Sequence, residues 1–402
     1  MRILMLNANL AGCGTYHRAL WFGRLLARHG RHDVTLCTVS PALRFRRETC
    51  TRDGVRISAG PHWGFRTIPG YGSNWLDIAW RWRELRFGGY DVVYAFEYHP
   101  NVRWPIYAGL RDSQTLLSDW CDWYAGAANV FRGCALAHRW DARCEERIRL
   151  RARRVSVISE ALQARTLALG LPPERVWLIR EGVDTRYMTP HDRDESRRLL
   201  GIAADARVVG TLNDGHAFPH LLAAFGHCRA RLPQARLLFV GGLSAAQRRL
   251  AAAQQLEQSI IVTGRCSDEL LPRYLAAADV FALPLEDTLA NRARFPHKIG
   301  DYLACGRPLV VSAVGDYPAL LRRADAAIVV DRLDDLPATL CRVLQDPACC
   351  HAYATRGRQW VEQHLDWELL APQVCAFVEG RAAPAPFSPA ATPGMSPRAV
   401  QL

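Results

Sequence analysis

The chain has 402 residues, of which 49% are hydrophobic and 22% are charged, and its formal net charge is +12. This composition is typical of a globular protein of two domains, since one domain usually holds about 100–200 residues. No run approaches the ~20 apolar residues that cross a bilayer, and no signal-peptide pattern opens the chain, so we expect a cytoplasmic protein. The thirteen cysteines show no metal-binding spacing, and we expect no metal site.

The positive charge is concentrated in the first part of the chain. Residues 1–180 contain 27 arginines, 15 acidic residues and ten of the twelve tryptophans, whereas residues 181–402 are neutral overall. Two interpretations stay open: arginine-rich solvated faces, or contact with an anionic partner such as a membrane surface or a phosphate-bearing acceptor. A nucleic acid fits the charge alone, but no nucleic-acid-binding motif is present, and we expect no such partner.

In the first half, short apolar runs alternate with amphipathic segments. Continuous Val/Ile/Leu runs separated by helices indicate parallel strands that are covered on both faces. The predicted strands are 2–8, 33–39, 55–60, 90–96, 115–120, 154–159 and 176–184, and the predicted helices are about 15–28, 74–86, 137–151 and 160–169. These segments form an expected N-terminal domain over residues 1–184, and the polar, turn-rich residues 185–205 are expected to form a linker.

The same alternation then restarts. The predicted strands are 207–213, 236–242, 260–264, 280–285, 308–314 and 327–331, and the predicted helices are 219–231, 244–256, 267–278, 296–304, 317–323 and 334–345. A second domain is therefore expected over 206–350, with further helices over 351–380 and a proline-rich, disordered tail over 381–402. The fold class is α/β, with two doubly wound Rossmann-like domains that face each other across a cleft, where ligands meet strand ends and helix N-termini.

A glycine loop follows the first strand, in NANLAGCGTYHRAL. Gly12 and Gly14 permit close approach of the backbone to a ligand before a helix begins near Thr15. A dinucleotide fingerprint needs a third glycine at position 17, where His17 stands, so the sequence disfavours an NAD-dependent enzyme. The loop suits an anion or sugar hydroxyls, and a plain strand-to-helix turn is the alternative.

Carboxylates and aromatic rings are interleaved in TLLSDWCDWY. Asp119 ends a strand, Asp122 follows three residues later with Trp123 beside it, and Glu97 follows the preceding strand. Carboxylates accept hydrogen bonds from sugar hydroxyls, and aromatic faces stack on sugar rings. The segment therefore indicates a carbohydrate site at the cleft, although an aromatic loop that fills the core remains the alternative.

Lys298 is the only lysine in the chain, and it lies in the segment NRARFPHKIGDYLACGRP. The segment joins a strand to a helix that begins near Pro296, which places the ammonium in the first helical turn. A helix N-terminus favours negative charge, so a lysine there indicates a bound polyanion. Arg294 is expected to contribute a forked contact to that anion, and Asp301, near the next turn, is expected to accept ribose hydroxyls.

With these motifs the chain resembles the GT-B fold glycosyltransferases of family 4, which are bacterial nucleotide-sugar transferases. The resemblance spans about residues 1–375 and rests on GTYHRALWFGRLLARHGRHDVTL, RVSVISEAL, REGVD, YLAAADVFALPL and HKIGDYLACGRPLVVSAVGD. It implies that the C-terminal domain binds a nucleotide-diphosphate sugar, that the N-terminal domain binds the acceptor, and that the last helix crosses back to the first domain.

The sequence departs from the family pattern at three places. The family commonly has two glutamates eight residues apart; Asp301 takes the second place and Ala293 the first. The family often has an Arg/Lys pair in the loop after the first strand of the second domain. Here that loop reads NDGHAFPH and lacks the pair, so Gly215 and His216 are left to approach a phosphate group. The usual histidine near the end of an N-domain strand is replaced by Asp119. With that cationic pair missing, Arg294 and Lys298 are expected to hold the diphosphate.

The resulting hypothesis is transfer of a sugar from a nucleotide-diphosphate sugar to a saccharide or lipid-linked acceptor, without cofactor or metal, in cell-surface glycan synthesis. The expected catalytic residues are Lys298, Arg294 and Asp119, the last as a candidate base. The expected donor-binding residues are Gly12, Gly14, Gly215, His216, Arg265, Asn291 and Asp301. The expected acceptor-binding residues are Thr15, Tyr16, Glu97, Asp122 and Trp123.

Two alternatives remain, a nucleotide-sugar epimerase and a non-catalytic nucleotide-sugar-binding homologue, and retention or inversion of configuration stays open. The basic first half also leaves open a peripheral position on the inner membrane face.

Overall fold

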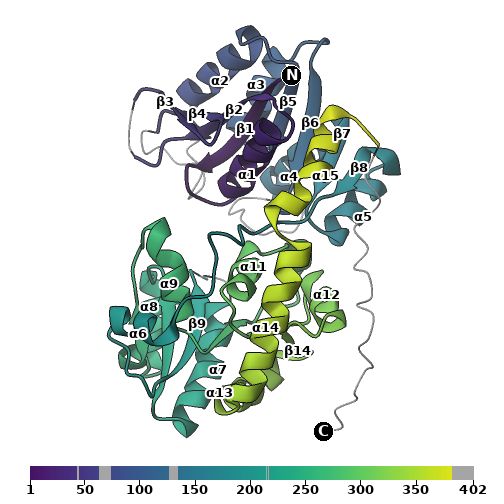
Figure 1. The fold of residues 1–402 in the computed structure, drawn as a ribbon. Coiled ribbons are helices and arrows are strands. Elements are labelled where there is room, and N and C mark those ends of the chain that lie inside the picture. The colour runs from purple at the N-terminus through teal and green to yellow at the C-terminus, as the bar shows by residue number, and fades with distance from the viewer. Residues whose placement is uncertain (43–44, 63–73, 126–134, 214, 216, 383–402) are drawn as a thin grey trace.

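The computed structural model describes residues 1–42, 45–62, 74–125, 135–213, 215 and 217–382, so His216 and residues 383–402 of the expected disordered tail lie outside the described residues. Two separate sheets, each flanked by helices, form the two lobes seen in Figure 1. The predicted α/β fold of two doubly wound sheets is confirmed.

The first sheet has eight strands in the order β3-β4-β2-β1-β5-β6-β7-β8, and all pairs are parallel except β3–β4. Its strands are β1 (Arg2–Leu10), β2 (Asp33–Val39), β3 (Glu48–Arg52), β4 (Val55–Gly60), β5 (Val92–Phe96), β6 (Thr115–Trp120), β7 (Arg154–Val157) and β8 (Val176–Leu178). Its helices are α1 (Tyr16–Arg28), α2 (Trp75–Phe87), α3 (Pro100–Gly109), α4 (Ala135–Arg151) and α5 (Glu160–Ala168). The central strands are buried along nearly their whole length, because helices cover both faces.

The second sheet has six strands, all parallel, in the order β11-β10-β9-β12-β13-β14. Its strands are β9 (Arg207–Leu212), β10 (Ala235–Val240), β11 (Ile260–Val262), β12 (Val280–Leu283), β13 (Leu309–Ser312) and β14 (Ile328–Val330). Its helices are α6 (Arg193–Leu200), α7 (Phe218–Arg231), α8 (Ala245–Ala253), α9 (Leu271–Ala276), α10 (Leu289–Arg292), α11 (His297–Ala304), α12 (Tyr317–Arg323) and α13 (Leu336–Gln345). The strand order reverses between β9 and β12, which is where a doubly wound sheet leaves a crevice for ligands.

Two final helices join the lobes: α14 (Pro347–His364) lies on the second lobe and α15 (Trp367–Glu379) on the first (Figure 1). The indole of Trp367 stacks on Trp21 of α1 with ring centroids 5.8 Å apart, and it meets Phe22 edge to face. The buried core of the first lobe therefore includes α15.

Several elements differ from the sequence-based expectation, and three of them are informative. β3 has five exposed residues and no apolar pattern, so hydrophobic periodicity does not reveal it. α3 has prolines at its start and in its interior, at Pro105, and residues of this kind usually mark loops. α6 lies inside the expected linker, and Arg197 ties it to the second lobe through an ion pair of 2.7 Å with Asp279.

The expected helical region over 351–380 is also interrupted. The side chain of Asp366 caps α15 by accepting a hydrogen bond from the Glu368 amide, and this cap starts a new helix after α14. Within the described residues, no helix combines the length and apolar character needed to cross a membrane.

Candidate active site

A cavity of about 400 Å³ lies between the two lobes and is lined by residues of both. The first lobe contributes the loop before α1, the segment after β6 and the segment after β8. The second lobe contributes the loop after β9 and the start of α11. Six predicted site residues line the cavity: Gly14, Thr15, Asp122, Gly215, Arg294 and Lys298. Residues separated by almost 300 positions thus meet at the facing edges of the two sheets.

Lys298 is the second residue of α11 and lies in its first turn, two positions after the N-cap residue Pro296. Its Nζ donates a hydrogen bond of 3.0 Å to the carbonyl oxygen of Leu212, the last residue of β9. The ammonium therefore lies beside the loop that carries Gly215 and at the positive end of a helix. These two sources of positive potential share one wall of the cavity, which suits an anionic ligand.

Arg294 connects the two lobes. Its Nε donates to Oδ1 of Asp122 at 3.2 Å, and its Nη1 donates to Oδ1 of Asn291 at 3.1 Å. Asn291 is buried and donates in turn to the carbonyl oxygen of Glu286, so it positions Arg294 and does not line the cavity. Arg294, expected to bind the nucleotide sugar, and Asp122, expected to bind the acceptor, are thus in direct contact.

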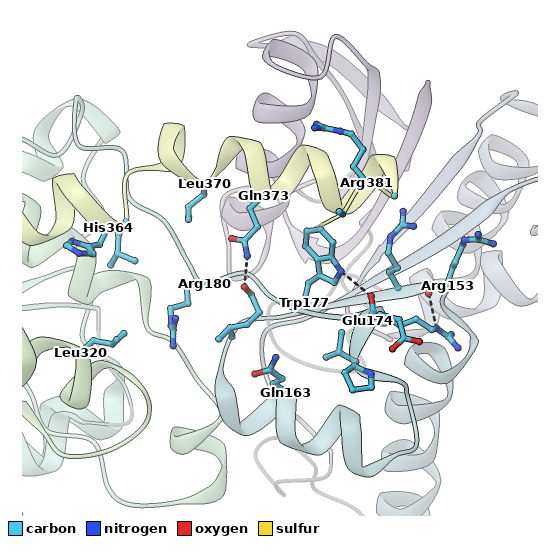
Figure 2. A pocket seen from close by; sticks show the side chains of 18 of the residues that line it. Arg153, Gln163, Glu174, Trp177, Arg180, Leu320, His364, Leu370, Gln373 and Arg381 are labelled. Carbon is cyan, nitrogen blue, oxygen red and sulfur yellow. Dashed lines mark hydrogen bonds between the residues drawn. The ribbon is translucent and has the colours of Figure 1, made fainter. Parts of the chain in front are cut away.

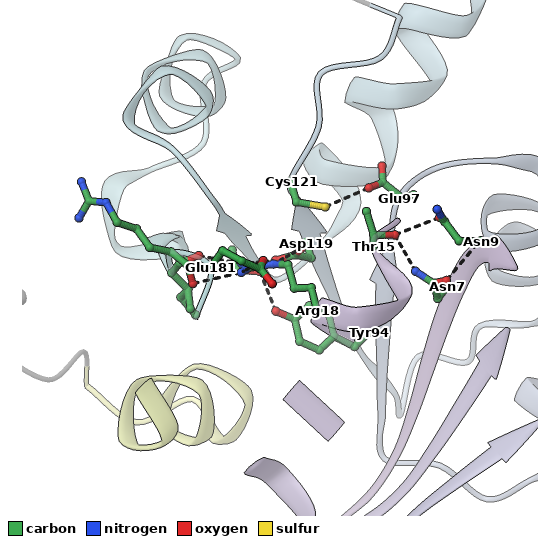
Figure 3. Close-up of polar contacts among 12 residues, drawn as sticks. Asn7, Asn9, Thr15, Arg18, Tyr94, Glu97, Asp119, Cys121 and Glu181 are labelled. Carbon is green, nitrogen blue, oxygen red and sulfur yellow. Dashed lines mark hydrogen bonds and ion pairs between the residues drawn. The ribbon is translucent and has the colours of Figure 1, made fainter. Parts of the chain in front are cut away.

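The glycine loop before α1 is compact. Gly14 has φ +54°, and a Cβ at this position would lie 2.1 Å from Nδ2 of Asn9, so only glycine fits without rearrangement. The hydroxyl of Thr15 accepts from Asn7 at 2.7 Å and donates to Asn9 at 3.0 Å (Figure 3). Thr15 therefore stabilises the loop, and both of these hydrogen bonds of its hydroxyl group lie within the first lobe.

Three further predicted site residues, Gly12, Tyr16 and Arg265, lie away from the cavity lining. Tyr16 is buried, and burial raises the pKa of its hydroxyl, so its expected contact with an acceptor is not supported by its position. Arg265 of the second lobe approaches the loop from the other side, with Nη2 4.0 Å from the place a Cβ of Gly12 would take. Gly12 and Arg265 thus face each other across the lobes, outside the lining.

Asp119, the predicted base, is not available at the cavity. Its carboxylate is fully buried and accepts from Arg18 at 2.9 and 3.1 Å, and the hydroxyl of Ser156 donates to it at 2.5 Å (Figure 3). A carboxylate that accepts two hydrogen bonds from one arginine and a third from a hydroxyl group stabilises the core of the lobe. The prediction of Asp119 as a cavity-facing base is therefore wrong.

Glu181 is the cavity carboxylate that sequence reasoning missed. It follows β8, lines the cavity and accepts from Nη1 of Arg18 at 3.3 Å, so Arg18 holds both Asp119 and Glu181 (Figure 3). Burial raises the pKa of Glu181 to about 7, and the negative charge of Asp119 acts in the same direction. Burial, and then the charge of Glu181, raises the pKa of Asp301 to about 7.

Glu97 lies in the interior of the first lobe, and Trp123 is partly buried against the core. Glu97 is fully buried with φ +75°, it accepts from Sγ of Cys121 at 3.0 Å, and burial raises its pKa well above the usual range. Trp123 is packed against the core, with the guanidinium of Arg165 over its ring at 5.6 Å. Neither residue lines the described cavity, so the structure does not support their expected contact with an acceptor.

Comparison with known proteins agrees with this geometry. Residues 19–187 match the family model described as Glycosyltransferase Family 4, and residues 205–346 match the model described as Glycosyl transferases group 1. The chain therefore resembles GT-B fold glycosyltransferases of family 4 over both of these ranges. The two matches lie on the two lobes, and the cavity between them is the cleft of this GT-B fold.

Solved GT-B structures share the arrangement of both lobes. Sucrose-phosphate synthase from Thermosynechococcus elongatus superposes with a TM-score of 0.75 at 20% identity, and covers 94% of this chain and 98% of its own. Anabaena Alr3699/HepE in complex with UDP-glucose superposes with a TM-score of 0.70 at 18% identity, and covers 94% of this chain and 100% of its own. At these identities the likeness establishes the fold.

Curated relatives match over a shorter range. A GDP-mannose-dependent monoacylated alpha-(1-6)-phosphatidylinositol monomannoside mannosyltransferase of Corynebacterium glutamicum is 30% identical over 49% of this chain and 54% of its own length. A D-inositol 3-phosphate glycosyltransferase of Thermomonospora curvata is 28% identical over 50% of this chain and 51% of its own length. The chain spans about half the length of these relatives.

Proposed function

We propose that the chain transfers a sugar from a nucleotide-diphosphate sugar to a saccharide or lipid-linked acceptor in the synthesis of a cell-surface glycan. The observation that carries the proposal is the position of the single ammonium group: Lys298 lines the inter-lobe cavity together with Arg294 and the start of α11. Two relatives support the same class of reaction, since one is a GDP-mannose-dependent mannosyltransferase and the other is a D-inositol 3-phosphate glycosyltransferase.

The roles of the cavity residues follow from charge. The departing nucleoside diphosphate gains negative charge as the bond to the sugar breaks, and Lys298 and Arg294 stabilise that charge. A well-placed donor of this kind contributes about 3–4 kcal/mol to lowering the barrier. Because these fixed cations can balance the diphosphate, the proposed reaction needs neither a metal ion nor a cofactor.

The acceptor side is proposed to include Asp122 and Glu181. Asp122 lies 3.2 Å from Arg294, so a diphosphate that binds Arg294 competes with this carboxylate and releases it toward hydroxyl groups. Glu181 is held by Arg18 at the same wall of the cavity. Carboxylates are strong acceptors for sugar hydroxyls, which matches a saccharide acceptor.

A peripheral position on an anionic membrane is the proposed setting for a lipid-linked acceptor. Large aromatic side chains are exposed on the helices of the basic first lobe: Trp75 (70% exposed), Phe87 (71%), Trp104 (47%) and Trp140 (59%). Interfacial aromatic rings accompanied by arginines are typical of proteins that lie on a lipid surface.

The test is thermal unfolding of the chain with UDP, GDP, ADP and TDP, followed by incubation with the matching nucleotide sugar. We expect one nucleotide to raise the unfolding midpoint, and the sugar to be transferred only when an acceptor is added. Formation of an isomeric nucleotide sugar without acceptor would identify an epimerase. Absence of stabilisation by every nucleotide would overturn the proposal in favour of a protein without this donor site.

A further inference from the structure

A second cavity, of about 1040 Å³, lies where α14 and α15 cross from the second lobe to the first (Figure 2). We call it the crossing groove; β7, β8 and α5 line one side, and α12, α14 and α15 line the other. None of the predicted site residues lines it. It adjoins the inter-lobe cavity at one point, because Arg180 lines the groove and its neighbour Glu181 lines the cavity.

The crossing groove is strongly basic. Five arginines and one glutamate line it: Arg153, Arg154, Arg175, Arg180, Arg381 and Glu174. Arg180 pairs with Glu160 and Asp316, and Arg381 pairs with Glu379. The other three arginines form no ion pair with a carboxylate anywhere in the described part of the chain. The groove therefore holds more cations than its own acids neutralise.

Two of these three arginines, Arg154 and Arg175, donate to backbone carbonyls, which carry no full charge. Arg154 donates to the carbonyl oxygens of Phe377 and Val378 at 2.8 and 3.1 Å, and Arg175 donates to that of Arg153 at 2.9 Å. Burial, and then the positive charge of Arg153, lowers the pKa of Arg154. Clustered cations of this kind repel each other, and a bound anion would relieve the repulsion.

The opposite end of the groove is richer in apolar side chains, and the imidazole of His364 also lies there (Figure 2). Leu320 of α12 and Leu370 of α15 lie there, and Figure 2 shows them well separated from Arg153 and Arg381. Leu365 and Trp360 also line the groove. Among the described residues, the buried Nε of Arg180 has no hydrogen-bond partner. The groove thus changes along its length from a cluster of arginines to a part that is mainly apolar.

We propose that the crossing groove binds an amphiphilic anion, with a phosphate head group at Arg153 and Arg175 and a hydrocarbon chain along Leu320 and Leu370. Guanidinium groups bind phosphate oxygens in a forked geometry, and the leucines offer the chain a surface away from water. This site is separate from the proposed sugar-transfer site, so either can fail without the other. A dissolved phosphate amphiphile and a phospholipid of a bilayer share this chemistry.

The experiment is calorimetric titration of the full chain with dodecyl phosphate below its critical micelle concentration. We expect one site per chain and at least tenfold weaker binding of inorganic phosphate. Arg153→Glu should weaken dodecyl phosphate binding at least tenfold. Arg153 is exposed and forms no ion pair with a carboxylate of the described residues, so this variant should fold. Its thermal unfolding midpoint checks that it does.

Arg248→Glu is the matched control, since Arg248 is exposed on α8 and outside the groove, and the substitution changes the net charge equally. Equal affinity of Arg153→Glu and the unaltered chain, or equal affinity for dodecyl phosphate and inorganic phosphate, would overturn the proposal. Flotation with phosphatidylglycerol vesicles distinguishes the sources. If the chain binds the vesicles, and this binding is lost in Arg153→Glu and kept in Arg248→Glu, the ligand is a bilayer lipid. If the chain binds dodecyl phosphate and not the vesicles, the ligand is a dissolved amphiphile.

Discussion

Replacement of Lys298 by alanine tests the proposed donor site most directly. The substitution removes the single ammonium group and its hydrogen bond of 3.0 Å to Leu212. One such bond contributes about 1 kcal/mol to stability, so the chain should remain folded. The effect on turnover should be larger, because a lost donor to the leaving diphosphate raises the barrier by about 3–4 kcal/mol. At ~1.4 kcal/mol per tenfold change, this corresponds to a loss of roughly 100- to 1000-fold in kcat/KM.

The assay combines nucleotide-induced shift of the unfolding midpoint with kcat/KM for the nucleotide sugar identified in the nucleotide panel. Arg292→Ala is the matched control: Arg292 is exposed in the same segment, pairs with Asp287 and lies outside the cavity. It should leave both measurements unchanged. Lys298→Arg should also impair turnover, because a planar fork does not reproduce a compact charge beside Leu212. Unchanged nucleotide affinity and turnover in Lys298→Ala would refute the assignment of the diphosphate to this wall of the cavity.

Two further predictions concern the buried carboxylates. Asp119→Asn should lower the free energy of unfolding by about 3 kcal/mol, because breaking a buried ion pair costs ~3–5 kcal/mol. Asp122→Asn, which breaks a more exposed ion pair, should change the free energy of unfolding by less than about 1 kcal/mol. Equal stability of the two variants in urea denaturation would contradict this prediction. Glu181 has its pKa raised to about 7, against about 4.3 in an unfolded chain, so the native state binds more protons between these values and stability falls as the pH rises from 5 to 8. Glu181→Gln should lose less stability over this range, and an identical decline in both proteins would count against a buried, protonated Glu181.

The sequence predicted the order of the elements well because buried parallel strands leave a strong local signal. Continuous apolar runs such as residues 33–39 and 55–60 coincide with β2 and β4 as found. The position of Lys298 was also predictable, since a strand, a proline and a helix fix where the first helical turn begins. β3 was not predicted, because an exposed edge strand needs no apolar residues.

The partners of the site carboxylates could not be read from strand order alone. The end of β6 places Asp119 at the correct edge, but Arg18, 101 residues earlier, takes both of its oxygens. One signal was present in the sequence: Arg18 shares the apolar face of α1 with Phe22 and Leu25, at helical spacing. An arginine on a buried helical face requires a buried acid, and two acids, Asp119 and Glu181, meet that requirement.

The contacts of Leu212 explain why one lysine suits this position in a chain that otherwise uses arginine. α11 holds both polar groups of that residue: Lys298 donates to its carbonyl oxygen at 3.0 Å, and its amide donates to the hydroxyl of Tyr302 at 2.7 Å. Lys298 and Tyr302 are four residues apart and therefore lie on one face of the helix. An ammonium has three donors around a single atom, so it can hold Leu212 and a phosphate oxygen from the same point. A guanidinium spreads its donors over a rigid plane, and the close approach of α11 to β9 would have to widen to admit it.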